Sequence, residues 1–214
     1  RFQNIQLAAN ANTLFDITSN AESLRLRFDH VDFSASGQRI IGLSTISPGN
    51  GFADRLLEMH HCTGVASDIL NAGGSSTLEG AYFEHCVWDL SGGYFSGAAV
   101  GANLVLNDVQ VHGGGARLAY FWDTIGYSRF SIENLSLSHT GANNCIGMAA
   151  TSTNNLDLRI ASILYTTAVG GAAFINLGSA AASPNSGLII DDVNLIKTVA
   201  DTASAAITID SDYT

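Results

Sequence analysis

A short pattern recurs eight times along the 214 residues of the chain. Each copy places apolar residues on both sides of one small or polar residue, as in RFQNIQL, LRFDHVDF, LEMHHCTG, AYFEHCVW, VLNDVQV, FSIENLSL, LRIASILY and LIIDDVNLI. These small or polar residues, one from each copy, form what we call the turn column: Asn4, His30, His61, His85, Asp108, Asn134, Ser162 and Asp192. Successive members lie 23 to 31 residues apart, and such a period is typical of stacked repeats.

The position after the turn column is apolar or Cys in every copy: Ile5, Val31, Cys62, Cys86, Val109, Leu135, Ile163 and Val193. We therefore predict that this second column faces the interior. The residue types of the turn column favour a left-handed backbone conformation, which Asn, Asp and His tolerate better than most residues.

A second apolar segment separates the copies: LFDIT, IIGLS, DILN, YFSG, AYFWD, CIGMA, AFINL and AITID. The segments are short, rich in β-branched and aromatic residues, and bounded by Gly, Asn, Ser and Asp, which predicts strands and turns. One such unit cannot bury its own apolar face, so neighbours must stack at about 4.8 Å. A sandwich would need hairpin turns, for which PGNG at 48–51 is the one candidate.

The period near 27 with variable gaps resembles that of right-handed parallel β-helices, so the expected fold is all-β: a right-handed single-stranded parallel β-helix with about eight coils of 23–31 residues. Residues 1–214 form one β-helix domain. RFQNIQL enters a strand directly, so we expect the domain to be part of a longer chain.

The charge excludes some partners. Nine basic residues stand against 19 acidic residues, a formal net charge of −10, which repels nucleic-acid phosphates. The chain contains no apolar run of the roughly 18–20 residues that a membrane helix needs, so we expect no membrane insertion.

Two neighbouring copies contain Glu, His and Cys together, in EMHHCTG and FEHCVWD. Cys62 and Cys86 should stack at about one coil spacing, either as a disulfide or as two reduced, buried thiols. Cys145 belongs to another strand and should be buried. The adjacent His30, His61 and His85 could converge on a metal, but the sequence places no further ligand clearly, which favours structural stacking. We expect neither a metal nor another cofactor.

The position before the turn column holds carboxylates at Glu84 and Glu133, two coils apart, with Asp108 near the coil between them. Two coil steps are about 9–10 Å, which side chains could close into the range used by inverting glycosidases. Glu84, Asp108 and Glu133 are therefore the candidate catalytic residues. Acidic residues are also common at the turns of so acidic a chain.

A candidate sugar platform lies in AYFWDTIGY, residues 119–127. Alternation predicts that Trp122 points outward, where its ring could stack on a sugar or lie in a subunit interface. We group Asp123, Tyr120 and Trp88 with it as candidate substrate-binding residues, with Tyr127 nearby.

The repeats LVLNDVQVHGGG, RFSIENLSLSH and GLIIDDVNLIK resemble the pectate-lyase-like β-helix superfamily, and in their Gly, Ala, Ser and Asn-rich texture they are similar to phage tailspikes and related virion appendages. The resemblance implies a homotrimer on a virion tail that recognises a host cell-surface glycan and hydrolyses it in some members. It transfers no catalytic motif to particular residues.

Three functions remain open. The first is a receptor-binding spike domain, with or without glycoside hydrolase activity, and it is the one that we favour. The second is a secreted polysaccharide-degrading enzyme, either a glycosidase or a lyase. The third is a purely structural solenoid of a virion or an adhesin.

Overall fold

The computed structural model describes residues 1–4, 6–7, 13–17, 23–34, 39–43, 54–66, 68–72, 78–90, 94–97, 100–113, 117–121, 127–139, 146–148, 155–167, 174–177, 187–197 and 207–209. All regular structure in these ranges is β-strand, and every strand pair is parallel. No helix of the described part is long and apolar enough to span a membrane.

The larger sheet follows the chain order along its main path. This path consists of β1 (Phe2–Gln3), β4 (Ser23–Asp29), β7 (Asp54–His60), β10 (Leu78–Leu90), β12 (Val100–Gly113), β14 (Tyr127–His139), β16 (Asn155–Thr167) and β18 (Gly187–Lys197). Three short strands extend the sheet beside the first coils: β2 (Gln6–Leu7), β5 (Asp32–Ser34) and β8 (Thr63–Ala66).

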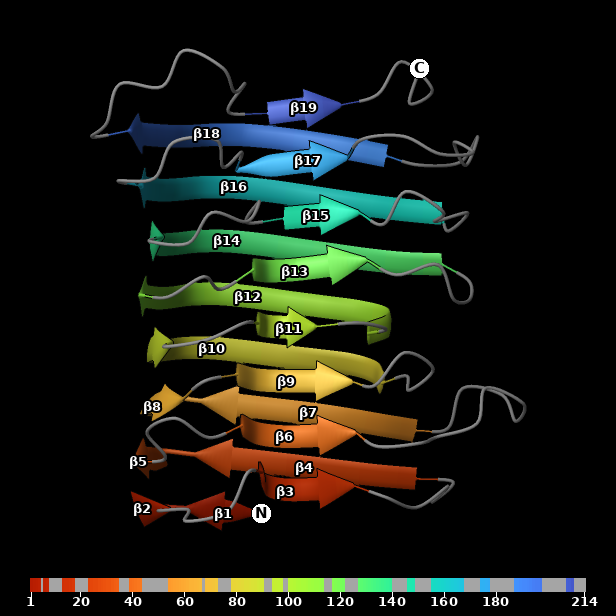
Figure 1. The fold of residues 1–214 in the computed structure, drawn as a ribbon. Coiled ribbons are helices and arrows are strands. Elements are labelled where there is room, and N and C mark those ends of the chain that lie inside the picture. Colours follow the sequence, from red (N-terminus) through yellow and green to blue (C-terminus); the bar gives the residue numbers. More distant parts are fainter. Residues whose placement is uncertain are drawn as a thin grey trace.

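The smaller sheet contains the strands that lie between those of the larger sheet in the sequence. In chain order these are β3 (Thr13–Ile17), β6 (Arg39–Leu43), β9 (Asp68–Ala72), β11 (Tyr94–Gly97), β13 (Arg117–Phe121), β15 (Ile146–Met148), β17 (Ile175–Leu177) and β19 (Ile207–Ile209). Each pairs with its neighbours in this series, so the two sheets run alongside each other from the red N-terminal strands to the blue C-terminal ones (Figure 1). The arrangement is compatible with a parallel β-helix.

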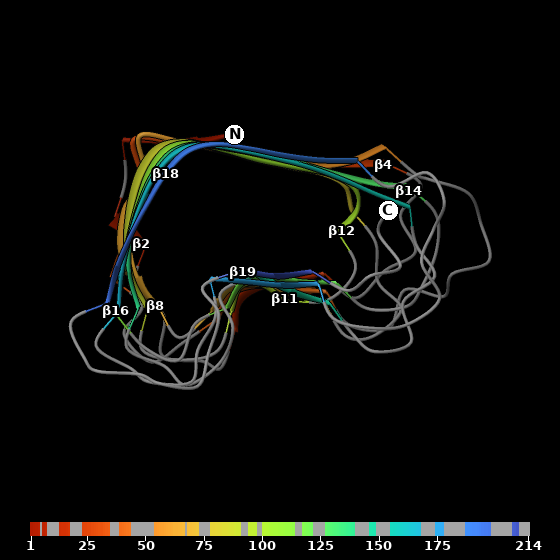
Figure 2. The same cartoon turned by 90° about the horizontal axis from the view of Figure 1, so that it is seen from above.

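The larger sheet bends sharply, and Figure 2 shows the bend as one corner of the cross-section. In the early coils the bend separates β4 from β5 at His30 and Val31, and β7 from β8 at His61 and Cys62. Later strands such as β10 run through it without a break.

The turn column forms this bend. The backbone φ angle is positive at all eight of its residues, between 47° at Asp192 and 54° at His30 and Ser162. This confirms the predicted left-handed conformation at these positions. Because such a φ is unfavourable for most side chains, each coil has a small polar residue or a His there.

The core lies between the two sheets and is built from columns of buried side chains. The column after the turn is buried as predicted at Val31, Cys62, Cys86, Val109, Leu135 and Ile163, and partly buried at Val193. Ile5 lies outside the described residues.

One glycine makes room for two large rings in this core. Gly64 lies in register between Phe33 and Trp88, whose ring centroids are 5.5 Å apart. A Cβ on Gly64 would lie 2.7 Å from the Phe33 carbonyl oxygen and 2.9 Å from the Trp88 ring. The absence of a side chain in the middle coil therefore allows the rings of the flanking coils to meet.

Candidate functional site

The candidate site lies on the outer surface of the bend, where polar side chains of neighbouring coils meet. Parallel pairing aligns the position before the turn column as Asp29, His60, Glu84, Asn107, Glu133, Ala161 and Asp191. Backbone hydrogen bonds continue across the bend: the amide of His30 donates to the His60 carbonyl, and that of His61 to the Glu84 carbonyl, both at 2.9 Å. The sheet thus holds these side chains one coil apart on a rigid backbone.

Three histidine rings form a stack on this surface. The ring centroids of His30 and His61 are 4.7 Å apart, and those of His61 and His85 are 4.8 Å apart, with interplanar angles of 25° and 14°. These distances match the spacing of the strands, so the stack follows directly from the turn column. The prediction of structural stacking is confirmed.

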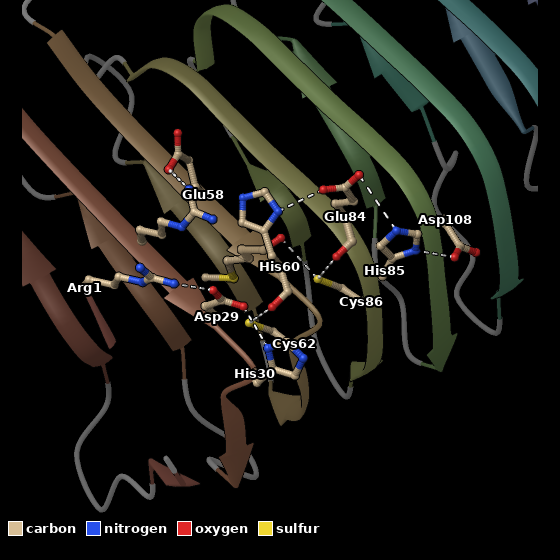
Figure 3. Close-up of polar contacts among 12 residues, drawn as sticks. Arg1, Asp29, His30, Glu58, His60, Cys62, Glu84, His85, Cys86 and Asp108 are labelled. Carbon is tan, nitrogen blue, oxygen red and sulfur yellow. Dashed lines mark hydrogen bonds and ion pairs between the residues drawn. The ribbon is translucent and has the colours of Figure 1, made fainter. Parts of the chain in front are cut away.

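Carboxylates flank the histidine stack at both ends. Asp29 accepts hydrogen bonds from the His30 Nδ1 and from the Arg1 guanidinium, each at 2.8 Å. At the other end, the His85 Nδ1 donates to the Asp108 carboxylate at 2.6 Å. Figure 3 shows the contacts of Asp29 with Arg1 and His30 and that of His85 with Asp108.

Asp29, at the Arg1 end of the stack, is nearly buried. Its residue is 8% exposed, and the Arg1 guanidinium, followed by the His30 ring, holds the pKa of Asp29 below its ordinary value. Partial burial opposes this shift but does not reverse it. Asp29 is therefore ionised at neutral pH and holds the side chains of Arg1 and His30 in the first coils.

His60 and Glu84 form a second polar pair on the same surface. The His60 Nδ1 lies 3.0 Å from Glu84 Oε2, and the other oxygen, Oε1, lies 3.8 Å from the His85 Nε2 (Figure 3). Glu84 thus links the histidines of two coils. Sequence reasoning considered these histidines as metal ligands and missed the pair, although the shared column of His60 and Glu84 contained the signal.

Within the predicted catalytic trio, Glu84 and Glu133 lie two coils apart as expected, but their side chains contact partners in different coils. Glu84 and Glu133 occupy one register column two coils apart, with Asn107 between them. Glu84 contacts His60 in the preceding coil, whereas Glu133 contacts the Arg159 Nε in the following coil at 3.4 Å. Their partners lie on opposite sides, so the two carboxylates converge only if both contacts open.

The three carboxylates are accessible to a ligand. The side chains of Glu84, Asp108 and Glu133 are 43%, 54% and 41% exposed. The Asp108 carboxylate accepts the hydrogen bond from the His85 Nδ1. The structure therefore assembles His60, Glu84, His85 and Asp108 into one cluster, with Glu133 one coil beyond it.

Trp88 does not belong to a surface platform. It is 0% exposed and packs against Phe33 in the core. A ring with no exposed face cannot stack on a sugar, so its expected role in substrate binding is wrong. Trp122 and Asp123 lie outside the described residues; Tyr120 lies in β13, but its side chain is not among those described.

Both described cysteines are free thiols, and they are fully buried at Cys62 and Cys86. This agrees with the reduced alternative. Cys145 lies outside the described residues. Among the described side chains, no group of three His, Cys, Asp or Glu is placed to hold a metal ion.

Comparison of this chain with protein families, with curated proteins and with solved structures finds no match. The likeness to pectate-lyase-like β-helices thus rests on the repeat pattern and on the parallel architecture.

Proposed function

We propose that the chain is a right-handed parallel β-helix of about eight coils, of the pectate-lyase-like kind, and that it recognises a host cell-surface polysaccharide as part of a trimeric virion appendage. The parallel pairing of both sheets supports the fold, and connections between parallel strands of one sheet are almost always right-handed.

The observation that carries the functional proposal is the polar column on the outside of the bend. Exposed or half-exposed donors and acceptors occupy four successive coils there, at His60, Glu84, Asn107 and Glu133, before Ala161 interrupts the run. A polysaccharide also presents hydrogen-bonding groups at regular intervals, so an extended glycan lying along the column would meet a partner at successive coils. Sheet-borne side chains are well suited to such recognition because their backbone is already ordered.

The charge of the chain specifies the class of glycan. A net charge of −10 and the carboxylates at the bend repel a polyuronate, whose carboxylates need basic partners. We therefore propose a glycan without acidic sugars as the ligand.

Hydrolysis of the bound glycan is the second candidate function, carried by the shared column of Glu84 and Glu133. In that reaction, one carboxylic acid protonates the leaving oxygen while the other carboxylate activates water. Since His60 and Arg159 draw the two groups apart, this activity requires substrate binding to open both contacts.

The test measures binding and depolymerisation of host surface polysaccharides by the full-length protein, beside Glu84→Gln, Asp108→Asn and Glu133→Gln. Asp191→Asn is the matched control, because Asp191 is an exposed carboxylate of the same register column but lies beyond Ala161, outside the polar run proposed to bind the glycan. We expect the wild type and Asp191→Asn to bind one glycan, and Glu84→Gln to bind it at least tenfold more weakly.

If the wild type cleaves the glycan, and Glu84→Gln or Glu133→Gln still binds it without cleaving it, the protein is a glycoside hydrolase. Binding that all variants retain equally places the glycan elsewhere on the surface. Absence of binding across a broad glycan panel contradicts the proposal and favours a structural solenoid.

A further inference from the structure

Cys62 and Cys86 are equivalent residues of adjacent coils. Each directly follows a left-handed residue of the turn column, His61 and His85 respectively. The pairing of β10 with β7 and with β8 has the same offset on both sides of the bend, which places Cys86 in register with Cys62.

The two thiols occupy one small region of the core. The Cys62 Sγ lies 3.4 Å from the His60 carbonyl oxygen, and the Cys86 Sγ lies 3.3 Å from that of Glu84. The Cys86 Sγ is also 3.5 Å from the carbonyl oxygen of Met59, which belongs to the coil of Cys62. Figure 3 shows Cys62 and Cys86 on the two neighbouring coils that also carry His60 and Glu84.

We propose that Cys62 and Cys86 form a reversible disulfide that fastens these two coils to each other. In-register neighbours of parallel strands have Cα atoms about 4.8 Å apart, which lies within the 4.4–6.8 Å range of disulfides. Their Cβ atoms are about equally far apart, slightly beyond the usual 3.5–4.5 Å. The bridge therefore draws the coils together at the bend and is more easily reduced than an unstrained one.

The environment of the two sulfurs gives them different roles. A hydrogen bond from the Cys86 thiol lowers the pKa of Cys62, whereas the same contact, with burial, raises the pKa of Cys86. The thiolate is the attacking species in disulfide exchange, so Cys62 reacts first.

The oxidant is a small disulfide such as oxidised glutathione. The Cys62 thiolate attacks one of its sulfurs, which forms a mixed disulfide and releases one glutathione thiol. The Cys86 sulfur then loses its proton and attacks the Cys62 sulfur, which forms the Cys62–Cys86 bond and releases the second glutathione thiol. Two protein thiols are oxidised and one disulfide is reduced to two thiols. Because both cysteines are buried, the exchange takes place before these coils stack or during local opening.

The test uses the full chain, refolded with either oxidised glutathione or dithiothreitol. Peptide mapping without reduction identifies the linked cysteines, and thermal unfolding measures the effect. We expect an intramolecular Cys62–Cys86 link, a midpoint about 5–10 °C higher in the oxidised protein, and loss of both after a few millimolar reduced glutathione.

Cys86→Val is the matched control, since Val109 occupies this column in the next coil. In this variant the oxidised and reduced samples should unfold at the same temperature. The proposal is overturned if Cys62 and Cys86 both remain available to alkylation after oxidation and denaturation, if either links to Cys145 or to a second chain, or if Cys86→Val retains the thermal shift. This outcome does not depend on glycan binding.

Discussion

The early and the late coils form the same bend with different side chains. His30, His61 and His85 stack their rings in the early coils, whereas Asn134 and Ser162 occupy the equivalent positions later. The φ angles of these five residues nevertheless lie between 51° and 54°. The backbone thus restricts the turn column to residues that tolerate this conformation, and contacts between coils select among them.

In the later coils, the turn-column residues Asn134 and Ser162 make side-chain hydrogen bonds but no ring contacts. Asn134 donates to the Asn107 side chain at 3.3 Å, and the Ser162 hydroxyl to Asp192 at 3.5 Å. Histidine adds ring contact to hydrogen bonding, so the early coils combine both along the stack.

The interior differs between the same two regions. Early coils contain large rings in mutual contact, from the stacked Phe2 and Phe28 to Phe33 and Trp88. Among the described residues, the later coils bury one aromatic residue, Phe174, and otherwise aliphatic ones such as Leu106, Val111, Ile132, Leu135, Leu137, Ile160 and Ile163. The contact between Phe33 and Trp88 spans an intervening coil and requires a small residue between the rings, and Gly64 provides it.

The largest effect should come from filling that space. We expect Gly64→Ala to lower the free energy of unfolding by about 3 kcal/mol, because the new methyl would overlap the backbone of Phe33. Urea denaturation measures the change. Gly80→Ala is the control: the three atoms nearest its Cβ all belong to the Tyr82 side chain, which can rotate away, so the cost should be below about 1 kcal/mol. Equal costs at both glycines would contradict this explanation of the aromatic core.

An intermediate effect is expected at the turn column. His61→Val should cost about 1–2 kcal/mol in unfolding free energy, because a β-branched residue is strained at a φ of 51°. His61→Asn, which imitates Asn134 of the later coils, should cost less, since Asn accepts this conformation. If the two variants are equally stable, ring stacking rather than backbone conformation determines the stability of the bend.

The predictability of the fold rests on these same constraints. The turn column and the buried column after it were both readable from the sequence, because a left-handed backbone and an inward-facing position each limit the residue types. The sequence also predicts the positions of the intervening strands; the DILN segment, for example, lies in Asp68–Ala72.

The candidate site was less predictable. Alternation outward from the buried Cys86 assigns Trp88 to the core, so that error was avoidable. The directions of Glu84 and Glu133 were not predictable. Each exposed carboxylate can reach several partners, and the energy differences between exposed pairs are small.

The smallest effect should be the pH dependence of the first coils. Because Arg1 and His30 lower the pKa of Asp29 in the folded protein, the unfolded chain takes up the proton first. The stability from Asp29 is therefore complete above its ordinary pKa of 3.8 and is lost as the pH falls through the lower, folded value. Urea midpoints between pH 5 and pH 2 should fall less steeply in Asp29→Asn than in the wild type.

Arg1→Gln should reduce the same slope, because it removes the main cause of the shift. Arg25→Gln is the matched control: it also removes one positive charge, but Arg25 pairs with Glu58 at 3.5 Å. A slope that changes equally in both arginine variants would assign the effect to net charge and not to the Asp29 contacts.

The stacking of parallel strands also determines how the protein responds to force. The hydrogen bonds between coils lie along the stack, and the chain climbs through it one coil at a time (Figure 1). Tension between the two ends of the stack therefore loads the terminal coil first and peels coils in succession. Each rupture releases one repeat of about 27 residues, roughly 90 Å of extended chain. Compression along the same axis presses the coils together, so the stack is stiff when pushed and yields stepwise when pulled.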